Sequence, residues 1–164
     1  NKTGGTESNM RTGEENSGAR FNKYREGVYG STNFCSNDWV LYRLTEIYYM
    51  KAEALMRKNG GVANQEVVNL INETRQRAYK AEDWNAVKYT TSTLTMDEFL
   101  AEKGREFIFE GKRRPDLIRF GKFSTGSWWD HEPTTSKHLT VYPIPYAQIA
   151  VNPNLVQNEG YVNE

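Results

Sequence analysis

Three glutamates recur at every fourth position of the segment EKGREFIFEGKRR: Glu102, Glu106 and Glu110. Residues four apart lie on the same face of a helix, so these carboxylates would stand in a row. Two carboxyl groups about 5 to 10 Å apart can act as general acid and general base in glycoside hydrolysis. The spacing is therefore compatible with a carboxylate-dependent hydrolase, in which Glu106 or Glu110 would be essential.

Arginines in and around the same segment favour a different interpretation of the glutamates. Like charges four residues apart on a helix are unfavourable unless cations compensate them. We therefore expect a structural network of ion pairs that holds this helix against the preceding ones, and no enzymatic activity. The expected members of the network are Arg43, Arg75, Glu102, Arg105, Glu106, Glu110 and Arg113.

Two adjacent tryptophans lie in the polar segment FSTGSWWDHEPTTSKH, residues 123–138, which has no helical periodicity. The exposed faces of Trp128 and Trp129 would stack on the apolar faces of sugar rings. Asp130 and His131 would offer hydrogen bonds to the sugar hydroxyls. These four residues are the candidate ligand-binding residues. In the alternative interpretation, the tryptophans anchor the loop by packing beneath it or against sequence outside this chain.

The sequence offers little for metal, cofactor or nucleic-acid chemistry. Its two histidines, His131 and His138, have no Glu-x-x-His spacing, and its single cysteine excludes paired-cysteine motifs. No glycine-rich phosphate-binding loop with its lysine is present. The 21 basic residues balance the 21 acidic ones, so no net charge steers the chain toward nucleic acid or an anionic membrane surface. We expect no metal, no cofactor and no nucleic-acid partner.

Helices are the elements expected to position these residues. Apolar residues at three- and four-residue spacing predict a helix from about Asp38 to Asn59, which Gly60 and Gly61 end. A second helix is expected at about residues 64–79. Because so few residues join them, the two helices must pack antiparallel, as in the hairpins repeated in tetratricopeptide arrays.

Two further helices are expected after an irregular loop. Thr95 and Glu98 form a capping box, in which each side chain satisfies a free N–H group at a helix start. The helix that begins there is expected to reach about Lys112. Pro115 suits the first turn of a short fourth helix that ends near Phe120. The predicted fold is mainly α: a tetratricopeptide-like hairpin plus further helices, with long irregular loops.

The two ends of the chain differ from the helical part. Residues 1–20 are too polar to nucleate a core, and we expect residues 1–36 to form a polar, irregular segment that joins to sequence outside this chain. Residues 37–164 are expected to form the helical region. Within it, VYPIPYAQIAVNPNLVQNEGY, residues 141–161, contains three prolines, which disfavour helix at the residues before them. Its apolar residues predict an irregular, proline-rich strap laid back over the core.

Four segments resemble, in the same order, the C-terminal portion of the SusD/RagB family. They are LYRLTEIYYMKAEAL at 41–55, INETRQRA at 71–78, EKGREFIFEGKRRPDLIRFGKF at 102–123 and YPIPYAQIAVNPNLVQNEGY at 142–161. The resemblance implies a longer parent protein, held at the outer surface of the outer membrane by a lipid anchor on an N-terminus outside this chain. It further implies non-catalytic glycan binding and delivery to a SusC-like TonB-dependent transporter. The alternative function is a tetratricopeptide-like adaptor that binds a protein or peptide.

Overall fold

The computed structural model describes residues 23–24, 38–128 and 131–162. The chain divides into two units, Asn1–Val40 and Leu41–Glu164. Within the described residues of the second unit, the helices are α1 Leu44–Lys58, α2 Gln65–Arg75, α3 Trp84–Val87, α4 Met96–Glu106, α5 Arg113–Arg119 and α6 Tyr146–Val151, with 3-10 turns at Gln76–Ala78 and Lys137–Thr140. In the same residues, β pairing is limited to one bridge between Trp128 and His131. The prediction of a mainly α fold is confirmed.

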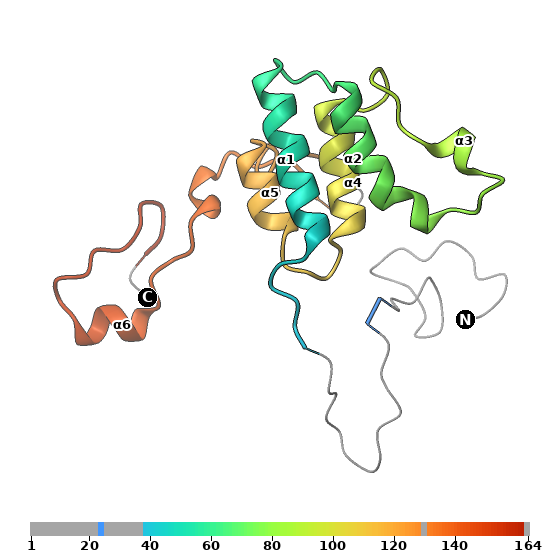
Figure 1. The fold of residues 1–164 in the computed structure, drawn as a ribbon. Coiled ribbons are helices and arrows are strands. Elements are labelled where there is room, and N and C mark those ends of the chain that lie inside the picture. Colours follow the sequence, from blue (N-terminus) through green and yellow to red (C-terminus); the bar gives the residue numbers. More distant parts are fainter. Residues whose placement is uncertain (1–22, 25–37, 129–130, 163–164) are drawn as a thin grey trace, which may run out of the picture. The chain divides into compact units, whose positions relative to one another are not determined.

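The predicted helical hairpin is formed by α1 and α2, which pack side by side (Figure 1). The turn between them contains Gly60 and Gly61 at φ angles of 65° and 87°, a region that glycine adopts without steric strain. Asn64 caps α2, since its side chain accepts a hydrogen bond of 3.0 Å from the Val67 N–H. The hairpin is thus built by local signals; its tetratricopeptide type stays a prediction.

The start of α1 differs from the predicted one. The helix begins at Leu44 instead of near Asp38, and the residue before it, Arg43, has extended backbone angles and makes no side-chain cap. The Arg43 side chain instead reaches Glu110, four residues beyond the end of α4, with N–O distances of 2.9 Å. A long-range ion pair therefore decides where this helix begins.

The predicted start of α4 is correct, but its predicted end is wrong. The Thr95 hydroxyl accepts a hydrogen bond of 3.2 Å from the Glu98 N–H, as expected for half of a capping box. The helix ends at Glu106 rather than at Lys112. The chain turns sharply at Phe109, whose φ of 62° lies in the left-handed region that a non-glycine residue rarely adopts.

The short fourth helix is α5, which contacts α4. Pro115 lies in its first turn, as predicted, where the missing backbone N–H of proline costs no helical hydrogen bond. Gly121 follows the helix at a φ of 69° and redirects the chain. The turn formed by residues 122–128 then follows and carries the first tryptophan of the loop.

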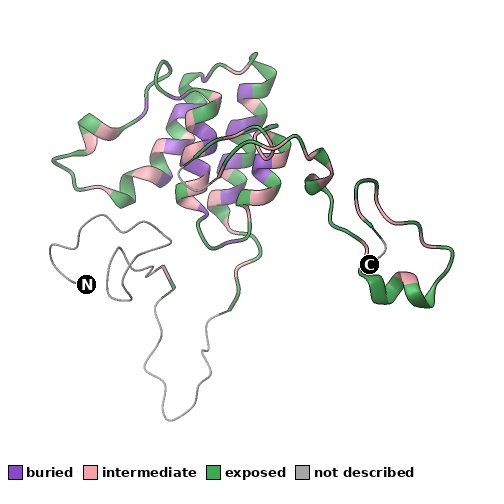
Figure 2. Ribbon diagram, turned by 180° about the vertical axis from the view of Figure 1, so that it is seen from behind, coloured by how far each residue is buried: buried purple, intermediate pink, exposed green. Residues whose placement is uncertain are grey.

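The hydrophobic core lies where α1, α2 and α4 meet, and Figure 2 shows the buried residues gathered on these helices. Tyr49, Ile71 and Phe99, one from each helix, are fully buried. The Tyr49 ring lies 5.6 Å from the Phe99 ring and meets the Phe107 ring edge-on at 5.1 Å between centroids. This core fixes the three helices that carry the charged clusters described below.

The C-terminal segment does not form the predicted strap. Val141 and Val151 are exposed, Val151 to 77%, so the prediction that they pack over the core is wrong. Polar side chains hold the segment to itself instead. Gln157 bonds to both the N–H and the C=O of Ile144, at 2.8 and 2.9 Å, and the Tyr161 hydroxyl donates to the Val141 carbonyl at 2.7 Å. These bonds satisfy part of the irregular backbone. The other apolar residues expected to pack, Ile144, Ile149 and Leu155, are half-buried.

The core can be tested with two isoleucines in helices. Replacing the fully buried Ile71 by Ala should lower the free energy of unfolding by about 2 to 5 kcal/mol, because the change removes packed methyl groups and leaves a cavity. The matched change at Ile47, which is 52% exposed on α1, should cost about 0.5 kcal/mol or less. Urea denaturation of both variants measures the difference. Equal losses would contradict this assignment of the core.

Candidate functional site

Glu102 is the centre of a buried polar cluster between α2 and α4. Its carboxylate accepts hydrogen bonds from Arg75 of α2 at 2.5 Å and from Arg105 of α4 at 2.7 Å. The Tyr89 hydroxyl lies 3.1 Å from this carboxylate and 2.6 Å from that of Glu98. Burial by itself would lower the pKa of Arg75, but its bond to the Glu102 carboxylate raises that pKa above the ordinary value. The two cations supply the compensation that a buried carboxylate requires.

A second cluster joins the start of α1 to the end of α4. Arg43 places two nitrogens on Glu110, each at 2.9 Å, and also pairs with Glu106 at 2.8 Å. Arg77, just after α2, pairs with Glu106 as well. Burial works against the charge on Arg43, yet the bonds to both carboxylates raise its pKa. This two-pronged contact is geometrically demanding and fixes the chain before α1 onto α4.

These contacts leave the glutamate row of α4 without the geometry of an acid/base pair. A general acid or base needs a carboxyl oxygen that can meet the substrate. Arg43 instead spans Glu106 and Glu110. Arg113, the remaining expected member of the network, points elsewhere. It donates to the Leu100 carbonyl at 2.8 Å and makes no ion pair within the described residues.

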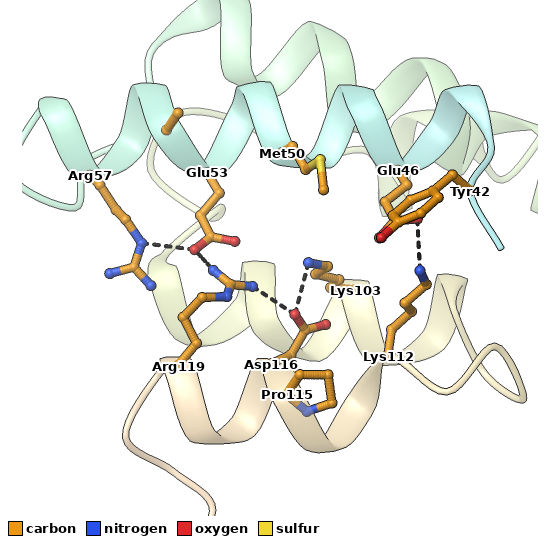
Figure 3. A pocket seen from close by; sticks show the side chains of 11 residues that line it. Tyr42, Glu46, Met50, Glu53, Arg57, Lys103, Lys112, Pro115, Asp116 and Arg119 are labelled. Carbon is orange, nitrogen blue, oxygen red and sulfur yellow. Dashed lines mark hydrogen bonds and ion pairs between the residues drawn. The ribbon is translucent and has the colours of Figure 1, made fainter.

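A cleft of about 560 Å³ lies between α1 and α5, with α4 behind it (Figure 3). Inside it, buried Lys103 of α4 pairs with buried Asp116 of α5 at 2.9 Å. Arg119 of α5 pairs with the same Asp116 and reaches Glu53 of α1. Two further ion pairs line the cleft: Arg57 with Glu53, and Lys112 with Glu46. Each carboxylate of the lining is paired with a lysine or an arginine, and these ion pairs tie α5 to α1.

A second cleft, of about 460 Å³, lies beside Trp128, and we call it the Trp128 cleft. Its walls come from α4, α5 and the turn at 122–128. Its lining residues are Asp97, Leu100, Ala101, Arg113, Leu117, Lys122, Thr125, Gly126, Ser127 and Trp128. A Cβ atom at Gly126 would lie 2.2 Å from the Trp128 ring, so only glycine allows the chain to pass so close to the indole.

The structure describes two of the four candidate ligand-binding residues. Trp129 and Asp130 lie outside the described residues. Trp128 and His131 lie together: their rings stack at 4.4 Å with 14° between the planes, and their backbones exchange hydrogen bonds of 3.1 and 2.8 Å. His131 therefore covers one face of the indole, while Trp128 remains 42% exposed as a wall of the cleft. His131 thus excludes a sugar from stacking on that face of the indole.

Arg113 and Lys122 line the Trp128 cleft, and sequence reasoning did not name them as ligand candidates. Arg113 was instead assigned to the ion-pair network. A signal was present in the run KRR at 112–114, because successive helical residues point about 100° apart and cannot all meet the same carboxylates. Arg114 illustrates this, since it donates to the Leu139 carbonyl at 2.9 Å.

The described residues contain neither a cluster suited to a metal ion nor a membrane-spanning helix. The described ranges contain no group of three or more His, Cys, Asp or Glu side chains placed to hold a metal ion. Over the same ranges, none of the helices combines the length and the apolar character needed to cross a membrane.

Most of the chain is similar in sequence to one family of known proteins. The sequence model of the SusD family matches residues 1–140. Starch-binding protein SusD of Bacteroides thetaiotaomicron is 38% identical over 131 residues, which cover 76% of this chain and 22% of that protein. SusD-like protein P25 of Formosa agariphila is 27% identical over 134 residues, which cover 78% of this chain and 25% of that protein. The chain thus spans about a quarter of the length of these relatives.

The buried ion pair between α4 and α5 can be tested by removing its lysine. Lys103→Met should lower the free energy of unfolding by about 3 kcal/mol, because Asp116 stays buried with Arg119 as its remaining cation. Lys80→Met is the matched control: that lysine is exposed and pairs with Glu82 at 3.6 Å, which predicts a loss below about 1 kcal/mol. Chemical denaturation compares the two, and similar losses would show that the buried pair is not stabilising.

The cluster around Tyr89 predicts a pH dependence of stability. Burial of Glu98 opposes its charge, but hydrogen bonds from Tyr89 and Arg105 together hold its pKa below the ordinary value. Because the folded pKa is the lower one, ionised Glu98 stabilises the fold above the unfolded pKa of about 4.3, and this stability is lost as the pH falls through the folded pKa. Tyr89→Phe should raise the pKa of Glu98, as measured by NMR titration of its carboxyl. Tyr146→Phe, at an exposed tyrosine, should leave it unchanged, and no rise in Tyr89→Phe would refute the assignment.

Proposed function

The chain belongs to the SusD family, and from that we propose that it is part of a protein that binds glycans at the cell surface without turning them over. The observation that carries the proposal is the 38% identity, over most of this chain, to a protein named for starch binding. The absence of turnover is supported by the glutamate row of α4, whose carboxylates are engaged by arginines. The helices form the scaffold, and the Trp128 cleft offers the contact surface.

The partners of the parent protein follow from the family alone. We infer that the parent is anchored to the outer membrane by a lipid and passes its glycan to a SusC-like TonB-dependent transporter. Nucleic acid is not an expected partner, since the basic and acidic residues are equal in number at 21 each. Capture outside the membrane and delivery to a pore would require binding that is weak enough to be reversed.

A peptide-binding adaptor is the second candidate function, and one observation favours it. Along α1, Leu44, Ile47 and Met50 are exposed at three-residue spacing, and Met50 also lines the cleft between α1 and α5. A helical partner could lie along such a face, as amphipathic helices do in apolar grooves. Preference for a peptide over every glycan tested would support this function over glycan binding.

Calorimetric titration of soluble polysaccharides and oligosaccharides against this chain tests the proposed function. We expect binding of at least one glycan and no release of shorter products. Trp128→Ala should weaken that binding about tenfold or more, since the sugar loses its aromatic wall and tenfold corresponds to about 1.4 kcal/mol. Trp39→Ala, which removes another exposed indole, is the matched control and should leave the affinity unchanged.

Each remaining outcome of this titration contradicts a different part of the proposal. Undiminished binding by Trp128→Ala would place the glycan site elsewhere. Absence of any glycan binding, with peptide binding retained, would favour the adaptor. Release of new reducing ends that Glu106→Gln or Glu110→Gln abolishes would show a hydrolase and overturn the non-catalytic assignment.

A further inference from the structure

We propose that the Trp128 cleft binds an acidic sugar residue, one that carries a carboxylate, with Arg113 as its anion-binding residue. This inference rests on the proposed glycan binding and adds to it the charge of the sugar. It starts from a contrast between Arg113 and the other arginines that the structure describes. The arginines with a carboxylate partner are Arg43, Arg57, Arg75, Arg77, Arg105 and Arg119.

Arg113 lines the cleft with most of its hydrogen-bonding capacity unused. Its Nη1 donates to the Leu100 carbonyl at 2.8 Å, and its other N–H groups have no partner in the part of the chain that the structure describes. A guanidinium carries five N–H donors in a planar fork that matches the two oxygens of a carboxylate. By contrast, Arg114 donates to two backbone carbonyls and lies 4.0 Å from the centre of the Tyr142 ring.

A glycine in the last turn of α4 leaves room for the Arg113 guanidinium. A Cβ atom at Gly104 would lie 2.9 Å from Nη1 and 3.1 Å from Cζ of Arg113, so a larger residue would push the side chain away. Glycine inside a helix costs about 1 kcal/mol relative to alanine, which indicates a packing reason for its presence. The Leu100 carbonyl and the bare surface at Gly104 together orient the guanidinium before a ligand arrives, and such preorganisation reduces the cost of binding.

The charges of the Trp128 cleft leave room for one anion. Lys122 pairs with Asp97 at 3.1 Å, and both side chains are exposed, so this pair is weak and self-compensating. Arg113 adds a positive charge without a counterion in the cleft. Partial burial and nearby Arg105 lower the pKa of Arg113, and Asp116 offsets this only in part. A ligand carboxylate would therefore meet a cation whose charge is poorly compensated by the protein.

The remaining walls suit a sugar ring better than a free anion. Leu117 and Trp128 provide apolar surface, while Thr125 and Ser127 provide hydroxyl groups. The Thr125 hydroxyl donates to the Gly121 carbonyl, which leaves its oxygen able to accept from a sugar hydroxyl. The volume of about 460 Å³ is within the usual range for small-ligand sites. The apolar wall suits the face of a sugar ring, the two hydroxyl groups suit its hydroxyls, and the guanidinium suits its carboxylate.

Paired acidic and neutral oligosaccharides test this inference. Oligogalacturonate and oligoglucuronate, each beside its methyl ester, are titrated calorimetrically into the chain. We expect at least one acidic form to bind about tenfold more tightly than its ester, a difference of about 1.4 kcal/mol. Arg113→Gln should abolish this preference and leave the affinity for the ester unchanged. Arg113→Lys keeps the charge without the fork and should retain part of the preference.

Arg77→Gln is the matched control, since it removes one positive charge from an arginine that does not line the cleft. It should keep the full preference for the acidic form. Far-UV circular dichroism and melting curves establish that each variant is folded, and Arg113→Lys provides a second reading if Arg113→Gln is unstable.

The outcomes separate this inference from the proposed function. If neutral glycans bind and neither acidic form is preferred over its ester, glycan binding stands and the acidic-sugar site is refuted. A preference that survives undiminished in folded Arg113→Gln, or in Arg113→Lys where the Gln variant does not fold, also refutes it. If no acidic or neutral glycan binds the wild-type chain, the inference and the proposed function fall together.

Discussion

The burial of the α4 carboxylates is the constraint on which the arrangement of the helices depends. A carboxylate removed from water costs several kcal/mol unless a cation and hydrogen bonds offset the loss. Glu102 obtains Arg75 from α2, and Glu110 obtains Arg43 from the start of α1. Neither α1 nor α2 can shift along α4 without uncovering a buried charge. The same contacts withdraw these carboxylates from chemistry, so the stabilising role and the non-catalytic proposal have a common cause.

The position of α5 follows from a second set of charges. Lys103 and Arg119 both hold Asp116, and Arg119 also reaches Glu53 of α1. These pairs fix the rotation of α5 about its own axis. Arg113, three residues before Asp116, consequently lines a different cleft, beside Trp128. The ion pairs between α1 and α5 therefore also set the position of the Arg113 guanidinium beside Trp128.

Local signals in the sequence were sufficient to predict some helix starts but not the start of α1 or the packing of the C-terminal segment. Asn64 and Thr95 mark helix starts because each cap bonds within three residues of itself. The start of α1 could not be predicted in this way, because Arg43 contacts a glutamate 67 positions along the chain. The C-terminal segment was predicted to pack over the core because of its apolar residues. Its backbone is instead bonded from within the segment, where Gln157 contacts both the N–H and the C=O of Ile144.

At the candidate site, too, some features could be predicted from the neighbouring sequence and others depend on the folded structure. Trp128 was identified from its polar surroundings, but the stacking of His131 on one of its faces is a property of the folded loop. Two residues depart from what their surroundings favour. Gly104 is a glycine inside a helix. Arg113 has no carboxylate partner among the described residues, although most of the described arginines have one. Departures from local consistency are expected at functional sites. Gly104 lies against the guanidinium of Arg113, and Arg113 lines the cleft beside an exposed indole. The specificity of the protein is therefore best sought at this cleft and not along the glutamates that arginines already engage.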